Sequence, residues 1–296
     1  MRYLLRVFLF VMLLHTHCCR AQQVQDVHAS KSAEQLSPAA FEEALTQGDE
    51  WVRNGRYDEA GRLYHNMLQQ TAPTSPYRQR IYAKFANLYN YTGRYKESVE
   101  MYYLALKHTR DTLTHIKLLV NMSAVFIDLK DYAKSMQNLD AALDLLAHSR
   151  NDYWAAIAHS SKGNVYGATG RNPAALAEYR KAYGLSQLVA KSQSSDQGTR
   201  HEMTDFCSLV LNNIADTYLK EDVPDSALHY LQLLPQNFAG MTQYSKCTAL
   251  VTMGQVYCRK GDDGLAMDCL KQALAIGEPS RYLILNRQAY ATLATL

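Results

Sequence analysis

The sequence predicts an all-α fold, an α-solenoid of about six helix-turn-helix units followed by a truncated seventh helix. Glycine and proline are sparse, with 14 and 7 among 296 residues, which disfavours a turn-rich β fold. Hydrophobic residues make up 47% of the chain and charged residues 20%, so it has enough apolar side chains to bury a core. The third observation is a unit that recurs six times and places each helix.

Residues 1–21 have the layout of a secretory signal peptide. A cationic start precedes the apolar run Val7–Leu14, and Cys19 and Ala21 place small residues before a cleavage point. The apolar run is too short to span a bilayer, which takes about 20 residues. We therefore expect an exported protein, periplasmic or secreted, with a flexible leader over 22–38.

The alternative interpretation of this segment is a lipoprotein signal with a lipid on Cys18, although His17 makes the motif match poor. Otherwise we expect a membrane link only through a helix downstream of this sequence. The first 21 residues hold three cations and no acid, so the rest balances 28 basic against 28 acidic residues. This balance argues against a nucleic-acid partner for this region.

Six copies of one unit fill residues 39–296. Each copy carries an aromatic residue followed by a short polar turn, and these aromatics are Trp51, Tyr89, Phe126, Tyr166, Tyr218 and Tyr257. They recur every 37–40 residues, except for a spacing of 52 between the fourth and the fifth. The residues three before and nine after each aromatic are all Gly, Ala or Ser, namely Gly48, Ala86, Ser123, Gly163, Ala215 and Gly254, then Ala60, Ser98, Ser135, Ala175, Ala227 and Ala266.

Small residues let two helices approach closely where they cross. Each unit is therefore predicted to be a helix A, a short turn and an antiparallel helix B. A large residue of helix B is expected at each crossing, and these residues are Tyr64, Tyr102, Leu139, Tyr179, Leu231 and Leu270. The predicted units are about 41–74, 79–111, 116–149, 156–190, 208–236 and 247–278, with a partial unit at 280–296.

This order of small, aromatic and small residues resembles the tetratricopeptide repeat (TPR) family over about residues 39–296. The spacings exceed the 34 residues of that family, and no consistent proline ends the units. The resemblance implies a right-handed superhelix whose concave wall is made of A helices. It also implies a protein or an extended peptide as the partner in the concave groove.

The start of the first helix and three irregular regions are also predicted. Ser37 followed by Pro38 favours a helix start with serine as the N-cap. The polar segment Lys191–Arg200 accounts for the longest spacing and is predicted to be a loop. The fifth helix B is predicted to be short because Pro235 follows it. Residues 280–296 resemble a helix A without its partner, so we expect a fragment of a longer protein.

The sequence contains no phosphate-binding loop, dinucleotide fingerprint, zinc-protease motif or nucleophile elbow. We therefore expect no catalytic residue, no cofactor and no metal site. Four cysteines follow the predicted signal peptide, namely Cys207, Cys247, Cys258 and Cys269. Small buried hydrophobes are the favoured interpretation, and a disulfide between Cys258 and Cys269 is the alternative.

A helical wheel of the second to fifth A helices predicts which residues face the groove. The candidates for peptide binding are Arg80, Lys84, Asn87, Tyr91, Lys117, Asn121, Asp128, Asn164, Asn213, Asp216 and Lys220. Each of these helices contributes one asparagine, although asparagine is a poor residue for a helix interior. An amide both donates and accepts hydrogen bonds, which suits an extended backbone. Ordinary solvated side chains on a concave face are an equal alternative.

Three functional hypotheses follow. The leading one is a non-catalytic binding module, the extracytoplasmic sensing part of a longer signalling protein. The second is a free-standing periplasmic or secreted scaffold. The third is the interaction region of an enzyme whose catalytic domain lies beyond residue 296. The sequence downstream would distinguish the three.

Overall fold

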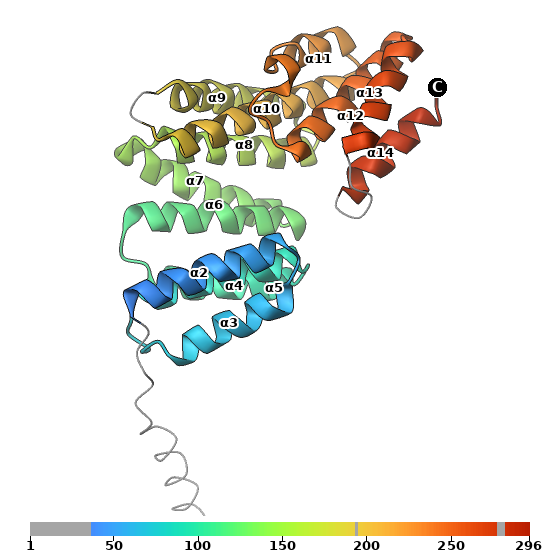
Figure 1. The fold of residues 1–296 in the computed structure, drawn as a ribbon. Helices are drawn as coiled ribbons and strands as arrows, with labels where there is room; N and C mark the ends of the chain where they lie inside the picture. The colour runs from blue at the N-terminus through green and yellow to red at the C-terminus, as the bar shows by residue number, and fades with distance from the viewer. Residues whose placement is uncertain (1–36, 193–194, 277–281) are drawn as a thin grey trace, which may run out of the picture. The chain divides into compact units, whose positions relative to one another are not determined.

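The computed structural model describes residues 37–192, 195–276 and 282–296. These residues form thirteen α-helices, α2–α14, and one 3-10 turn, and they contain no β-strand (Figure 1). The predicted all-α fold is therefore confirmed. The predicted signal peptide and Cys18 lie outside the described residues, as does most of the predicted leader. None of the described helices is long and apolar enough to cross a membrane.

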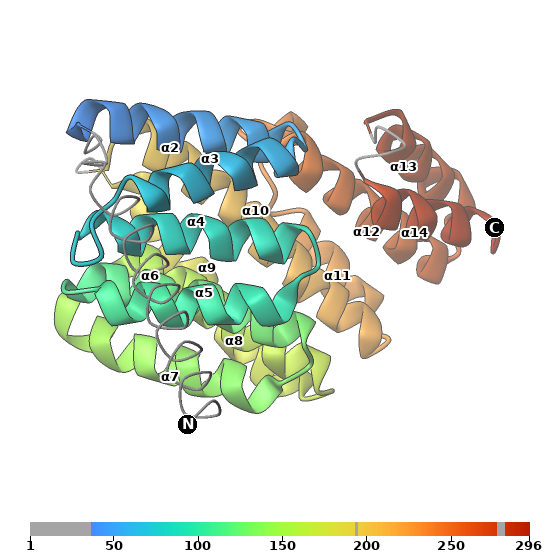
Figure 2. The ribbon, with the colours of Figure 1, turned by 90° about the horizontal axis from the view of Figure 1, so that it is seen from below.

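The chain divides into two compact units, one ending at His108 and one beginning at Thr109. The first unit contains two hairpins, whose helices are α2 (Pro38–Arg53), α3 (Tyr57–Gln69), α4 (Tyr77–Tyr91) and α5 (Tyr95–His108). Figure 2 shows these four helices side by side in chain order. Phe41, Tyr64 and Ile81 lie at the centre of their common core.

The second unit contains the remaining helices. Its first two hairpins are α6 (Thr112–Asp128) with α7 (Tyr132–Ser149), and α8 (Asp152–Ala168) with α9 (Asn172–Lys191). Two further hairpins are α10 (Gln197–Lys220) with α11 (Pro224–Leu231), and α12 (Gln243–Lys260) with α13 (Asp263–Ile276). The 3-10 turn η1 (Gln236–Phe238) precedes α12, and α14 (Leu283–Leu293) packs on α12 and α13 (Figures 1 and 2).

All six A helices with a predicted aromatic end in the same way. The backbone N–H five residues after the aromatic donates to the carbonyl of the aromatic, as from Arg56 to Trp51 at 2.8 Å. The residue just before that N–H has a positive φ, which closes the helix as a left-handed cap. Four of these six residues are glycines, such as Gly55 at 73°, whereas Lys130 and Asp222 adopt 59° and 57°. The turn geometry is therefore shared even where glycine is absent.

The twelve predicted small residues are all buried, which confirms the predicted helix crossings. A Cβ added to Gly163 would lie 2.4 Å from the ring of Tyr179, and one added to Gly254 would lie 2.6 Å from Leu270. In the second hairpin, the hydroxyl of Ser98 on helix B donates to the Ala86 carbonyl on helix A at 2.7 Å. Small residues therefore serve both close packing and direct hydrogen bonding between helices.

The prediction of a loop over Lys191–Arg200 was wrong in extent. Helix α9 continues to Lys191, and α10 already begins at Gln197. Asp196 is the N-cap, because its carboxylate accepts from the backbone N–H of Thr199 at 2.8 Å. The long spacing is thus filled by two long helices of 20 and 24 residues.

Three other predictions are confirmed. Helix α11 has only eight residues and ends four residues before Pro235. Helix α14 lies where the seventh helix A was expected, and Ser37 accepts from the backbone N–H of Ala40 as an N-cap. The four cysteines are free thiols, so Cys258 and Cys269 do not form the alternative disulfide, but the prediction of buried cysteines holds only for Cys247.

Candidate binding surface on the A helices

The predicted groove residues belong to both units. Arg80, Lys84, Asn87 and Tyr91 lie on α4 of the first unit, and the others lie on α6, α8 and α10 of the second. Tyr91 is 65% exposed, and Asp128 and Lys220 are also exposed, whereas Asn121 is half-buried.

The two cations of α4 among the predicted groove residues, Arg80 and Lys84, are neutralised by acids of α2. Arg80 forms an ion pair with Glu42, and its guanidinium also stacks over the ring of Phe41. The ammonium of Lys84 lies 2.7 and 2.6 Å from the two carboxylate oxygens of Asp49. Hydrogen bonding from Arg80 lowers the pKa of Glu42. These cations therefore tie neighbouring A helices together and are not available as a free basic surface.

Two predicted asparagines are held by tyrosines of helix B. The hydroxyl of Tyr102 donates to the Asn87 side-chain carbonyl at 2.5 Å, and that of Tyr179 donates to Asn164 at 2.8 Å. The two residues of each pair are 15 positions apart, so each bond links the two helices of one hairpin. Burial raises the pKa of both tyrosines, which keeps their hydroxyls protonated as donors.

The first hairpin repeats this arrangement with an aspartate. Tyr64 is 15 positions after Asp49, and burial, the negative charge of Asp49 and a hydrogen bond with Asp49 raise the pKa of Tyr64, in that order of importance. In all three cases the tyrosine is the large residue at the helix crossing. Its hydroxyl emerges on the face of helix A that was predicted to line the groove. The wheel therefore located the asparagines, but the tyrosines that hold them were expected only to fill space.

Contacts between neighbouring A helices also involve the asparagines. The amide nitrogen of Asn213 on α10 donates to the side-chain carbonyl of Asn164 on α8 at 3.4 Å. That carbonyl already accepts from Tyr179, so both of its lone pairs are used. The amide nitrogen of Asn164 remains as the group that can donate to a ligand, because Asn164 is exposed.

A hollow of about 470 Å³ lies on the A helices α10, α12 and α14 of the second unit. This groove hollow is lined by Asp216, Leu219, Lys220, Gln255, Cys258, Arg259, Gln288, Ala291, Thr292 and Thr295. Its charges are largely paired, with Asp216 bonded to Lys220 at 2.7 Å and Arg259 to Asp222 at 2.7 Å. The surface is thus nearly neutral and rich in amides and hydroxyls.

Only two of the predicted groove residues, Asp216 and Lys220, line this hollow. Gln255, Arg259 and Gln288 were missed, because the wheel was applied only to the second to fifth A helices. Gln255 and Arg259 stand two before and two after Tyr257, the same places that Asp216 and Lys220 occupy around Tyr218. Extending the wheel to the sixth helix would have found them.

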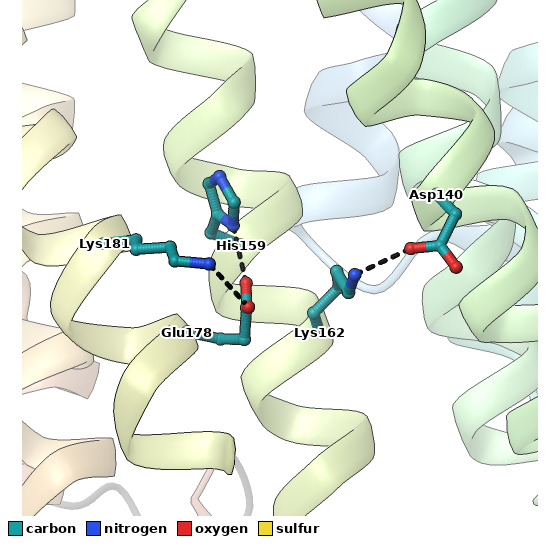
Figure 3. A network of polar contacts seen from close by, with 5 residues as sticks. All are labelled: Asp140, His159, Lys162, Glu178 and Lys181. Carbon is teal, nitrogen blue, oxygen red and sulfur yellow. Dashed lines mark hydrogen bonds and ion pairs between the residues drawn. The ribbon is translucent and has the colours of Figure 1, made fainter.

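The α8–α9 hairpin contains a polar network that also reaches Asp140 of α7 (Figure 3). The Glu178 carboxylate accepts from Nδ1 of His159 at 2.6 Å and from Lys181 at 3.0 Å. Lys162 of α8 pairs with Asp140 of α7 at 2.7 Å. Burial raises the pKa of Glu178, but the bonds from His159 and Lys181 outweigh it, so the pKa is lowered overall. Because both oxygens are engaged, Glu178 joins the helices and is poorly placed to act as a base.

Among the described residues, no group of three or more His, Cys, Asp or Glu side chains is arranged to hold a metal ion. Cys247 is buried and the other three cysteines are half-buried. Burial raises the pKa of the Cys207, Cys247 and Cys269 thiols, which favours their protonated, less nucleophilic form.

The comparisons with known proteins identify the fold. A tetratricopeptide-repeat family model matches residues 79–111. Solved structures with a similar fold include the apo form of RapI (TM-score 0.62, 13% identity, 86% of this chain and 96% of RapI). NprR in complex with its cognate peptide NprX has a TM-score of 0.61 at 12% identity, covering 95% of this chain and 80% of NprR.

A chain of the APC/C hetero-tetramer Cut9–Hcn1 has a TM-score of 0.61 at 16% identity, covering 93% of this chain. This chain spans about half the length of that relative, 46%. No curated protein matches the sequence. Residues 79–111 therefore match a tetratricopeptide repeat, and the chain shares its helical-repeat fold with these solved structures.

Proposed function

We propose that this chain is a non-catalytic module that binds an extended protein or peptide segment on the A helices of its second unit. The observation that carries the proposal is the groove hollow on α10, α12 and α14. Gln255 and Gln288 offer both donors and acceptors there, as an extended backbone requires. Asp216 is paired with Lys220 and Arg259 with Asp222, so these charges make the surface polar without a strong net charge.

The structural neighbours support a peptide as the class of partner. The NprR structure contains its cognate peptide NprX, and this chain resembles NprR in fold over most of its length. At 12% identity the likeness concerns the fold, and the residues proposed to bind a partner are those that line the groove hollow.

Peptide selection from a phage-displayed random library tests the proposal. We expect peptides selected on the wild-type protein to bind the double variant Gln255→Ala/Gln288→Ala at least about tenfold more weakly, because several polar contacts are lost. Gln272→Ala is the matched control, since Gln272 is an exposed glutamine on helix α13 outside the hollow. Equal binding by all three proteins, or no selected peptide, would contradict the proposal.

The proposal also places the module outside the cytoplasm, as the sensing part of a longer signalling protein. Its support is the cationic start and the apolar run Val7–Leu14 in residues 1–21. Fusion of residues 1–21 to a phosphatase that is active only after export is expected to give an active reporter. An inactive fusion would overturn export and would leave the binding proposal standing.

A further inference from the structure

A second hollow, of about 640 Å³, lies at the N-terminal end of α8 in the second unit. We call it the Trp154 pocket. Helix α6 contributes Lys117, the end of α7 contributes Arg150, and the first turn of α8 contributes Trp154. Leu188 of α9 and Glu202 of α10 also line the pocket. The proposed groove function does not involve this pocket. Lys117 is the one residue of the pocket that was also among the predicted groove residues.

The long repeat of the sequence builds one wall of this pocket. Helices α6, α8 and α12 begin 14 residues before their characteristic aromatic, whereas α10 begins 21 residues before Tyr218. The two additional turns carry Thr199 and Glu202, and both line the pocket. Leu188 and Val189 of the long helix α9 line it as well. The residues that lengthen this repeat to a spacing of 52 therefore form one wall of the pocket.

The pocket combines apolar surface with a polar edge. The ammonium of Lys117 lies 5.8 Å from the centre of the Trp154 ring, and Tyr153 contacts the same ring edge-on at 5.4 Å. Leu188 is 62% exposed, although a large aliphatic side chain normally avoids water. Trp154 and Leu188 thus offer apolar surface that an occupant would cover.

The charges of the pocket are unequally satisfied. The carboxylate of Glu202 accepts from the Tyr153 hydroxyl at 2.6 Å. Asp152 lies in the first turn of α8, where the helix dipole stabilises a negative charge. In contrast, neither Lys117 nor Arg150 forms an ion pair with any residue in the described part of the chain. Lys117 and Arg150 are therefore available to bind an anion. The negative charges of Asp152 and Glu202 disfavour a ligand that carries more than one negative charge.

We propose that the Trp154 pocket binds a monoanionic carboxylate with an apolar body. Lys117 and Arg150 hold the carboxylate, and Trp154 and Leu188 cover the apolar part. The volume lies within the range of about 300–1,000 Å³ that is typical of small-molecule sites. The C-terminal residue of a peptide and a free organic acid share this chemistry.

Tryptophan fluorescence gives a direct readout of the pocket. The chain contains two tryptophans, and Trp51 lies in the first unit, so a Trp51→Phe background leaves Trp154 as the sole reporter. Three probes are titrated, namely acetyl-Ala-Ala-Leu with a free carboxylate, the same peptide as its C-terminal amide, and hexanoate. We expect a saturable change with the free carboxylate and none with the amide.

Two variants remove the cations without disturbing the backbone. Lys117→Gln removes one charge, and Arg150→Gly removes the other at a residue whose φ of 48° suits glycine. Each is expected to weaken carboxylate binding about tenfold, as the loss of a charged hydrogen bond does. Lys271→Gln, at an exposed residue of helix α13, is the matched control and is expected to bind as the parent does.

The outcomes separate the sources and decide the proposal. Tighter binding of the peptide acid than of hexanoate identifies a peptide C-terminus, and similar binding identifies a small organic acid. Either result supports the shared chemistry. Equal binding of acid and amide, competition by inorganic phosphate at equal concentration, or no effect of Lys117→Gln and Arg150→Gly would overturn it. If the peptide selection fails to support binding at the groove hollow, the proposal for the Trp154 pocket still stands. The two tests use different variants, Gln255→Ala/Gln288→Ala for the hollow and Lys117→Gln and Arg150→Gly for the pocket.

Discussion

In three hairpins the large residue at the helix crossing is a tyrosine, and in the other three it is a leucine. The tyrosines Tyr64, Tyr102 and Tyr179 fill the same space as Leu139, Leu231 and Leu270, and all six are buried. Only a tyrosine carries a hydroxyl through to the groove face, where it holds Asp49, Asn87 or Asn164.

The leucine hairpins place no hydroxyl at the equivalent position. That position holds Ala124 in the Leu139 hairpin, and Asp216 and Gln255 in the other two. Asp216 and Gln255 line the groove hollow. The difference teaches that the crossing residue determines how a groove side chain behaves. In the tyrosine hairpins helix B fixes the polar group of helix A, whereas in a leucine hairpin any fixing comes from helix A itself, as Lys220 does for Asp216.

The largest expected effect comes from crowding a tyrosine crossing. Gly163→Ala places a methyl group 2.4 Å from the buried Tyr179 ring, so we expect a loss of about 1–3 kcal/mol in the free energy of unfolding. Gly184→Ala is the control, because Gly184 lies in helix α9 with no atom within 4 Å of the added Cβ. It is expected to stabilise the protein by up to about 1 kcal/mol through helix propensity. Urea denaturation followed by circular dichroism measures both, and equal effects would contradict the packing argument.

A smaller effect is expected from removing one hydroxyl. Tyr102→Phe keeps the ring but deprives the Asn87 carbonyl of its donor, so we expect a loss of about 1 kcal/mol. The neighbouring Tyr103→Phe is the control, since Tyr103 is 54% exposed whereas Tyr102 is 2% exposed. The free energy of unfolding of the two variants is compared by denaturant titration. An equal loss of unfolding free energy in both variants would show that the hydrogen bond from Tyr102 to Asn87 does not stabilise the fold.

The smallest effect is a pH dependence in the α8–α9 hairpin. The pKa of Glu178 lies below its ordinary value of 4.5 in the folded protein, because His159 and Lys181 outweigh burial. Its stabilising contribution is therefore complete above that value and is lost as the pH falls through the lower, folded-state pKa.

Glu178→Gln removes this titration, so its stability should fall less steeply than that of the wild type at acid pH. Asp144→Asn, an exposed acid on α7, should keep the wild-type slope. Thermal unfolding from about pH 6 down to about pH 3 measures the slopes. Parallel curves for Glu178→Gln and the wild type would exclude a role of this network in acid stability.

Much of the fold could be predicted because it depends on local spacing. Gly48, Ser98 and the other small residues recur at fixed distances from the aromatics, and helix crossings need small side chains wherever they occur. Pro235 marked the short helix α11 for an equally local reason. Lys191–Arg200 misled the prediction because polarity marks exposure, and an exposed helix start capped by Asp196 is as polar as a loop.

The binding surface was less predictable because its chemistry depends on pairs distant in sequence. Arg80 looked like a free cation, but Glu42, 38 residues earlier, neutralises it. Asn164 looked like a free amide, but Tyr179 and Asn213 occupy its carbonyl. A wheel shows the face on which a residue lies, but it does not show which partners reach that face from another helix.

A double-mutant cycle between Tyr179 and Asn164 tests most directly whether the crossing tyrosine holds the groove amide. Tyr179→Phe, Asn164→Ala and the double variant are compared with the wild type in free energy of unfolding. The hydrogen bond of 2.8 Å predicts a coupling of about 1 kcal/mol, so that the second substitution costs little once the first is made. Additive effects, with a coupling indistinguishable from zero, would contradict the account.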